Sequence, residues 1–352
     1  MTGGGHRYTA VPSPALEAEL ERALAGIAAE IDALNLPKLR AVALGGGYGR
    51  GEGGVRHTER GDRLYNDLDF FVFASGADGA AARRIDRALE RVSEQWERRL
   101  GVAVDFGPVK NLEALKKVTG TLMYQELLRG WKSVWGEADW TQFLAALPPE
   151  RLPFSEAARL LLNRGMGLLF AGDCLRKGSE DADFIVRNMN KALLGCGDAL
   201  LLASGRYRWR GAERVAAFAG YVQKEGLPAE YARFYEKAAR WKLEPVPVLS
   251  AHPAEQWGEC RGFFLDAVCQ AAGVPEGSDR RAVAAGLSRN ARKERSLKNF
   301  LRWARRTGRV RRRGMWDAPA VTVLGKLYAH IRECGGLPEC PSELRRLWKA
   351  FR

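Results

Sequence analysis

The stretch LRAVALGGGYGRGEGGV, from Leu39 to Val55, joins an apolar run to seven glycines, and NDLDFFVF follows it at residues 66–73. The apolar run before the glycines and the one after the aspartates are short and bounded by turn residues, which predicts two strands. Side chains alternate along an extended chain, so Asp67 and Asp69 are predicted to share one face. The sequence therefore predicts a glycine turn at the end of one strand and a carboxylate pair at the start of another.

The two aspartates form a candidate metal site. Two carboxylates side by side repel each other unless a cation lies between them, and oxygen ligands favour Mg²⁺. A third carboxylate, Asp105, lies in VAVDF at residues 102–106, where alternation places it on the face opposite Val104. If this strand lies beside the strand of Asp69, three carboxylates can share two metal ions, an arrangement that serves phosphoryl transfer. The candidate catalytic and metal-binding residues are Asp67, Asp69 and Asp105.

The glycine turn is a candidate phosphate site. Backbone amides of a glycine-rich turn can approach a phosphate chain closely because no side chain intervenes. Arg50, three residues after Gly47, is placed to donate to a phosphate oxygen through its guanidinium group. Tyr48 is counted with the nucleotide-binding residues, although a packing role would explain it equally. The turn residues expected to surround a triphosphate are Gly46, Gly47, Gly49 and Gly51.

A glycine turn after a strand, D-L-D at the start of another strand and a later strand carboxylate together resemble the nucleotidyltransferase superfamily. That superfamily includes DNA polymerase beta, aminoglycoside nucleotidyltransferases and CCA-adding enzymes, and GGYGRGE is most similar to the uridylyl- and adenylyltransferases of nitrogen-regulatory proteins. The resemblance covers about residues 39–136. It implies that Gly47, often Ser in the family, contacts the triphosphate, that Asp67 and Asp69 bind Mg²⁺, and that Asp105 completes the site and helps deprotonate the acceptor.

One departure from the family pattern lies between the two motifs. The 19 residues that separate Gly47 from Asp67 are several more than the family usually has. We expect an inserted loop here, which affects the reach of Arg50 and substrate entry.

The rest of the chain predicts an α+β fold, in which a nucleotidyltransferase-type small mixed sheet with flanking helices precedes an all-helical region. Residues 12–34 and 80–100 show helical spacing, and residues 120–136 predict a helix and then a short extended piece. Prolines at 148, 149 and 153 mark a boundary, after which helical spacing returns at 154–175, 184–204, 210–223, 229–243 and 256–272. The expected domains are a nucleotidyltransferase domain at 1–150, a helical acceptor-binding domain at 151–275 and a basic helical region at 276–352.

Charged residues interrupt the apolar helix predicted at 184–204. Lys191 and Asp198 are seven residues apart, about two helical turns, so they are expected on one face. In one interpretation Lys191 contacts a nucleotide phosphate and Asp198 orients or deprotonates the acceptor. In the other, both belong to an internal network of ion pairs and hydrogen bonds that fixes the helix, because buried charges need partners.

A basic tract occupies residues 289–313, with twelve Lys or Arg against the single acid Glu294. Its cations recur at helical spacing beside an apolar set, which suits a phosphate backbone bound without sequence preference. A solvated helix face would explain the pattern equally, and the tract could equally help to hold the triphosphate. The possible polyanion-binding residues are Arg295, Lys298, Arg302, Arg305, Arg306 and Arg309.

Composition narrows the class of protein only moderately. The formal net charge of +14 is consistent with a polyanionic or phosphate-bearing partner. The absence of a long apolar run and of a signal-like N-terminus predicts a cytoplasmic protein without a membrane segment. The six cysteines show no C-x-x-C pair, so neither a zinc site nor a disulfide framework is indicated.

The sequence thus predicts a Mg²⁺-dependent nucleotidyltransferase that binds an NTP such as ATP and transfers its NMP to an acceptor with release of pyrophosphate. An RNA end, a small molecule and a protein side chain all remain open as the acceptor. The alternative is a catalytically silent sensor of nucleotides or nucleic acids on the same fold. A toxin-neutralising or partner-binding protein is a third interpretation, which would require a partner encoded nearby.

Overall fold

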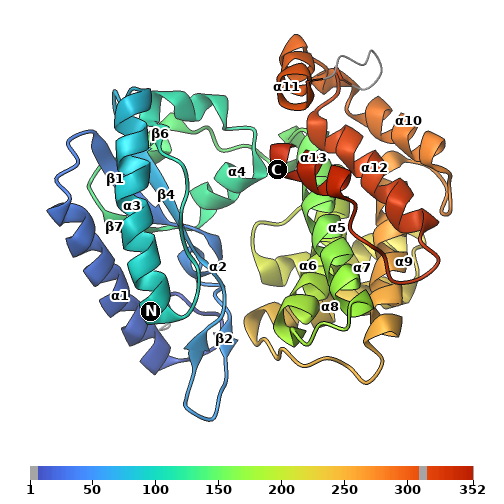
Figure 1. The fold of residues 1–352 in the computed structure, drawn as a ribbon, viewed down its shortest axis with the longest axis horizontal. Coiled ribbons are helices and arrows are strands. Elements are labelled where there is room, and N and C mark those ends of the chain that lie inside the picture. The colour runs from blue at the N-terminus through green and yellow to red at the C-terminus, as the bar shows by residue number, and fades with distance from the viewer. Residues whose placement is uncertain (1–6, 309–314, 352) are drawn as a thin grey trace. The chain divides into compact units, whose positions relative to one another are not determined.

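The computed structural model of the chain describes residues 7–308 and 315–351, which form a mixed α+β structure (Figure 1). The chain divides into two compact units. The first comprises Met1–Leu147 and Arg240–Val246, and the second comprises Pro148–Ala239 and Pro247–Arg352. The chain first passes between units close to the boundary expected at residue 150, and residues 276–352 belong to the same unit as most of the preceding helical region.

The first unit contains a small mixed sheet, to which the described residues contribute five strands. They are β1 (Leu39–Leu44), β4 (Leu68–Ala74), β5 (Val104–Phe106), β6 (Lys110–Asn111) and β7 (Lys132–Trp135). The strand order is β5-β4-β1-β7. The strand β6 also pairs with β4, along residues of β4 that follow those paired with β5. The central strand β1 runs antiparallel to β4 and β7, whereas β4 runs parallel to β5 and β6. The sheet is therefore mixed, as the sequence predicted.

Helices cover both faces of this sheet. Those of the first unit are α1 (Pro14–Ala33), α2 (Gly46–Gly49), α3 (Gly79–Leu100), α4 (Leu122–Arg129) and 3-10 helices at Leu112–Lys117 and Thr141–Phe143. On one face, α1 and α3 pack on alternate residues of β4 such as Phe70 and Val72. On the other, α4 and the first 3-10 helix pack around Phe73. The strict alternation along β4 decides on which face Asp67 and Asp69 lie.

The expected inserted loop contains a two-stranded hairpin of β2 (Val55–Arg56) and β3 (Arg63–Leu64). Strands of two residues are too short to give a hydrophobic pattern, so the sequence predicted only an insertion at this place.

The second unit is helical over its described residues. Its elements are α5 (Phe154–Arg176), α6 (Ala182–Ala203), α7 (Gly211–Glu225), α8 (Ala229–Leu243), α9 (Pro253–Ala272), α10 (Arg280–Asn290), α11 (Leu297–Thr307), α12 (Pro319–Glu333), α13 (Ser342–Phe351) and 3-10 helices at Pro149–Arg151 and Arg292–Glu294. The last residues of α8 belong to the first unit. The buried helix α5 lies against α6, α9 and α12. Among the described helices, none is both long enough and apolar enough to span a bilayer.

Candidate functional site

The antiparallel pairing of β1 and β4 brings the glycine turn to the aspartates. Because β1 ends where β4 begins, the turn that follows Leu44 lies beside the first residues of β4. The Gly45 amide donates a 2.8 Å hydrogen bond to the Asp69 carbonyl oxygen. The topology therefore joins two motifs that are about 20 residues apart in the sequence.

Gly46 lies directly against the side chain of Asp69. Its φ of 62° is in the left-handed region, and a Cβ at this position would overlap the Asp69 carboxylate. Only glycine meets both conditions without strain. The amides of Gly46, Gly47 and Tyr48 begin the turn α2, so they have no acceptor within it. A carboxylate and a set of backbone donors are thus held within one small region.

Asp105 lies beside Asp69 on the neighbouring strand. In the parallel pair of β4 and β5 these two residues are direct Cα partners, and the neighbouring Val104 points into the core on the opposite face. Both aspartates are solvent-exposed. The pKa of Asp105 is raised, first by partial burial and then by the negative charges of Asp67 and Glu97. The structure therefore places Asp105 beside Asp69 and within electrostatic reach of Asp67.

The donor chemistry of these carboxylates fits a hard cation. The pKa of Asp105 is raised by partial burial and then by neighbouring negative charge, and a cation would offset the charge. Within residues 7–308 and 315–351, however, no three His, Cys, Asp or Glu side chains stand ready as a joint metal-binding group. Mg²⁺ commonly takes only one or two protein carboxylates and completes its shell with water and substrate phosphates. Asp67 and Asp69, with Asp105 next to them, are the residues that would hold it.

The side chain of Tyr48 supports the turn from inside. It is fully buried. Its hydroxyl donates a 2.7 Å hydrogen bond to the Gly54 carbonyl oxygen and accepts one of 3.0 Å from the Tyr65 amide. Burial raises the pKa of Tyr48 to about 12. Asn66 accepts a further hydrogen bond from the Gly54 amide at 2.7 Å. These contacts close the inserted loop onto the turn, so packing is the role of the Tyr48 ring, and its backbone amide remains for phosphate contact.

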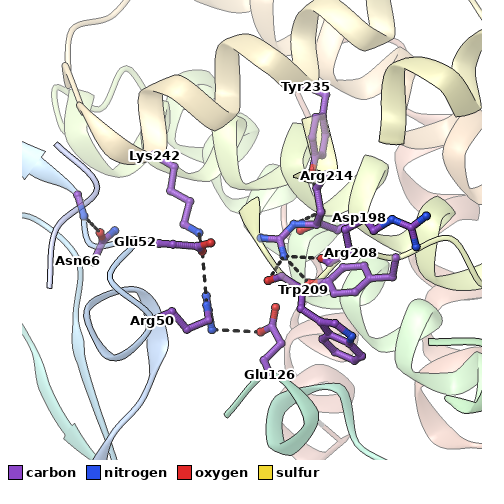
Figure 2. A network of polar contacts seen from close by, with 12 residues as sticks. Arg50, Glu52, Asn66, Glu126, Asp198, Arg208, Trp209, Arg214, Tyr235 and Lys242 are labelled. Carbon is purple, nitrogen blue, oxygen red and sulfur yellow. Dashed lines mark hydrogen bonds and ion pairs between the residues drawn. The ribbon is translucent and has the colours of Figure 1, made fainter. Parts of the chain in front are cut away.

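Arg50 lies in an ion-pair network rather than alone (Figure 2). Its guanidinium group is 3.5 Å from the carboxylate of Glu52 and 3.5 Å from that of Glu126, and only 14% of its side chain is exposed. Two carboxylates therefore compensate the charge that the sequence assigned to a phosphate. Phosphate binding by Arg50 requires an exchange of partners.

A segment from far along the chain completes this network. Lys242 places its ammonium group 3.9 Å from Glu52, and the Trp241 ring packs edge-on against Tyr65 at a centroid distance of 5.5 Å. His57 in the inserted loop lies 3.4 Å from the carboxylate of Glu244. Sequence reasoning missed Lys242, because a lysine at the end of an amphipathic helix carries no local sign that it approaches a glycine turn.

Asp198 belongs to an internal network of the second unit (Figure 2). Its carboxylate accepts a 2.5 Å hydrogen bond from the Tyr235 hydroxyl and lies 3.1 Å from the Arg214 guanidinium group. Arg214 also donates to the Tyr207 hydroxyl and to the carbonyl oxygens of Arg208 and Trp209. For Asp198, this arrangement matches the interpretation in which the charges of α6 belong to an internal network.

Lys191 is half-buried on α6, in the same unit as Asp198. Its role in nucleotide binding stays a prediction.

The basic tract folds largely as predicted around α11. Arg295 is bound to the buried carboxylate of Asp317 at 2.6 Å, so it serves the fold. Lys298, Arg305 and Arg306 are exposed and Arg302 is half-buried. Arg309 lies outside the described residues.

Comparison of the sequence with protein-family models and with curated proteins gives no match.

Proposed function

We propose that the chain is a Mg²⁺-dependent nucleotidyltransferase that transfers an NMP from an NTP to an acceptor and releases pyrophosphate. The observation that carries the proposal is the contact of Gly46 with the Asp69 carboxylate, next to Asp105 on the adjacent strand. Backbone amides that can donate to phosphate oxygens and carboxylates that can bind a metal ion are needed together where a charged phosphate chain is bound and transferred. The order of these motifs resembles the nucleotidyltransferase superfamily, as the sequence indicated.

The carboxylates have distinct roles in this proposal. Asp67 and Asp69 hold Mg²⁺, which when bound neutralises phosphate charge and favours attack at the α-phosphorus. Asp105, whose pKa is raised by burial and by neighbouring charge, accepts the proton of the acceptor group. A bond then forms between the acceptor and the α-phosphorus, the bond between the α-phosphorus and its bridging oxygen breaks, and pyrophosphate leaves.

The glycine turn and the neighbouring cations bind the outer phosphates. The amides of Gly46, Gly47 and Tyr48 point from the start of the turn without acceptors inside it. Arg50, two residues after Tyr48, and Lys242 both form ion pairs with Glu52. A triphosphate carries more negative charge than a carboxylate, so it can replace Glu52 as their partner.

The second candidate function is a catalytically silent sensor of nucleotides. Within the described residues no three His, Cys, Asp or Glu side chains are grouped to hold a metal ion, which favours this alternative because a silent sensor needs no catalytic metal. A sensor would bind nucleotide without releasing pyrophosphate.

The deciding experiment measures pyrophosphate release from each of the four NTPs with Mg²⁺, in the presence of cellular RNA or of a small-molecule extract. We expect release by the wild type and its loss in Asp67→Asn/Asp69→Asn. Glu90→Gln/Glu94→Gln, which removes two exposed charges from α3, is the matched control and should retain activity. Nucleotide binding without release by the wild type under every condition would support the sensor instead.

A further inference from the structure

The helix α11 carries a stripe of cations that the proposed function does not use. Lys298, Arg302, Arg305 and Arg306 lie within about two turns on one side of the helix, and no acidic residue occurs between 295 and 308. In the described part of the chain, none of these four side chains has a carboxylate within ion-pair distance. The charges of the four cations add along one side of the helix, so this stripe is an unbalanced positive surface.

Like charges gather at the edge of this stripe. The pKa of Arg302 is lowered, first by burial and then by the positive charges of Arg159 on α5 and Arg306. The Arg302 guanidinium group also lies over the Phe351 ring, 5.8 Å from its centre, which keeps it at this position. Positive groups from two helices therefore act on Arg302. Arg159 also lies 3.4 Å from the Glu156 carboxylate, and an anion placed beside Arg302 would relieve the repulsion that remains.

Exposed apolar side chains lie along the other side of the stripe. Leu297 and Leu301 are 58% and 56% exposed, and the Trp316 ring is 44% exposed. The backbone of Trp316 accepts a 3.1 Å hydrogen bond from the Ser296 amide, and its ring packs 5.3 Å from that of Phe300. An exposed aromatic ring is thus fixed at the start of α11, beside the cations.

The positions of the side chains around α11 distinguish a bilayer surface from a nucleic-acid strand as the ligand of this surface. Trp303 is buried, and at about 100° per residue Arg305 and Leu301 both lie some 160° away from it, at the most outward positions. A helix that lies in a bilayer surface must present a wholly apolar outward face, and here Arg305 would enter the hydrocarbon. A single nucleic-acid strand presents phosphates and flat apolar bases side by side, which matches adjacent cationic and aromatic surfaces.

We propose that the surface formed by α11 and Trp316 binds single-stranded nucleic acid. The phosphates follow Lys298, Arg302, Arg305 and Arg306, and a base stacks on the exposed face of Trp316. The proposal goes beyond nucleotidyl transfer and does not rest on it, since binding along this surface needs neither an NTP nor the carboxylates of the first unit.

The test uses the full-length chain and a fluorescent single-stranded RNA of about 20 nucleotides, with the DNA of the same sequence in parallel, titrated without NTP at several salt concentrations. Lys298→Gln/Arg305→Gln/Arg306→Gln should bind at least 10-fold more weakly. Its slope of log affinity against log salt should be smaller by about 2, because roughly 0.7 counterions are released per phosphate contact on a single strand. Trp316→Ala should weaken binding roughly 5-fold or more and leave the salt slope unchanged.

The matched control is Arg84→Gln/Arg91→Gln/Arg98→Gln, which removes the same charge from exposed positions of α3 in the other unit and should bind like the wild type. Equal weakening by the control would show that net charge alone governs binding and would overturn the proposal. Vesicles with anionic phospholipid that bind the wild type while RNA and DNA do not would overturn it in favour of a membrane surface. A difference in affinity between the RNA and the DNA identifies which of the two nucleic acids the surface prefers.

Discussion

Gly46 and Asp69 are in such close contact that the glycine has no room for a side chain: a Cβ at position 46 would overlap the Asp69 carboxylate. The contact joins the end of β1 to the start of β4, and it couples the backbone donors of the turn to a metal-binding candidate. The free energy that a side chain at position 46 would lose through this overlap can be measured separately from the strain of the left-handed backbone.

We expect Gly46→Ala to destabilise the chain more than Gly101→Ala. Both glycines have φ near 65°, which costs an alanine about 1 kcal/mol, but nothing lies within 4 Å of a Cβ at Gly101. Chemical denaturation should show a further loss of roughly 1–3 kcal/mol at position 46 from overlap with Asp69. Asp69→Ala should recover most of that excess in the double variant, and additive effects would contradict the contact.

Arg50 provides the second prediction, because its two carboxylate partners compete with a bound phosphate. We expect Glu126→Gln to tighten NTP binding about 5-fold, since one competitor loses its charge, and Arg50→Gln to weaken it at least 10-fold. Calorimetric titration with a non-hydrolysable NTP analogue measures both. Glu137→Gln, an exposed change of the same chemistry, should have no effect. Weaker binding by Glu126→Gln would show that this ion pair positions Arg50 for the phosphate instead.

Much of the secondary structure was predictable because its signals are local. The strand at 39–44, the carboxylate face of β4 and the ends of α8 all follow from short-range periodicity, and the structure has them at those residues. The contact of Gly46 with Asp69 follows from strand pairing, which a pattern along one strand does not show. Register likewise decides that Asp105 lies opposite Asp69.

The residues that sequence reasoning missed act through long-range contacts. Glu126 and Lys242 meet the glycine turn from 76 and 192 residues beyond Arg50, and neither has a motif that sets it apart from other surface charges. The role of Tyr48 depends equally on loop closure, since its hydroxyl bonds to residues that follow it by 6 and 17 positions. Such contacts are decided by tertiary packing, which overrides local propensity.

The raised pKa of Asp105 predicts how pH changes stability. Between its ordinary value near 3.8 and its raised folded value, the folded state binds more protons than the unfolded state, so stability falls as pH rises through that window. We therefore expect Asp105→Asn to be more stable than the wild type at pH 7 and to lose this advantage below about pH 3.8. Urea denaturation at both pH values measures the difference.

Mg²⁺ should reverse the difference in stability between the wild type and Asp105→Asn at pH 7, because a cation beside Asp105 offsets the charges of Asp67 and Asp105. At pH 7, added Mg²⁺ is expected to raise the melting temperature of the wild type more than that of Asp105→Asn. Glu90→Gln, an exposed change on α3, should respond to pH and Mg²⁺ as the wild type does. An equal response of wild type and Asp105→Asn to Mg²⁺ would remove Asp105 from the metal site.

Asp198 allows structural and catalytic roles to be separated by two substitutions at one position. Only 6% of the Arg214 side chain is exposed, so Asp198→Ala leaves a nearly buried cation and the Tyr235 hydroxyl without their carboxylate partner. A loss of about 3 kcal/mol is expected, since removal of one member of a buried pair leaves its charge uncompensated. Asp198→Asn keeps an oxygen that accepts from both groups, so it should lose less than half as much. If the network is structural, Asp198→Asn also transfers nucleotide at the wild-type rate once an acceptor is known. A stable Asp198→Asn protein with turnover reduced 100-fold or more would instead assign the carboxylate to the acceptor.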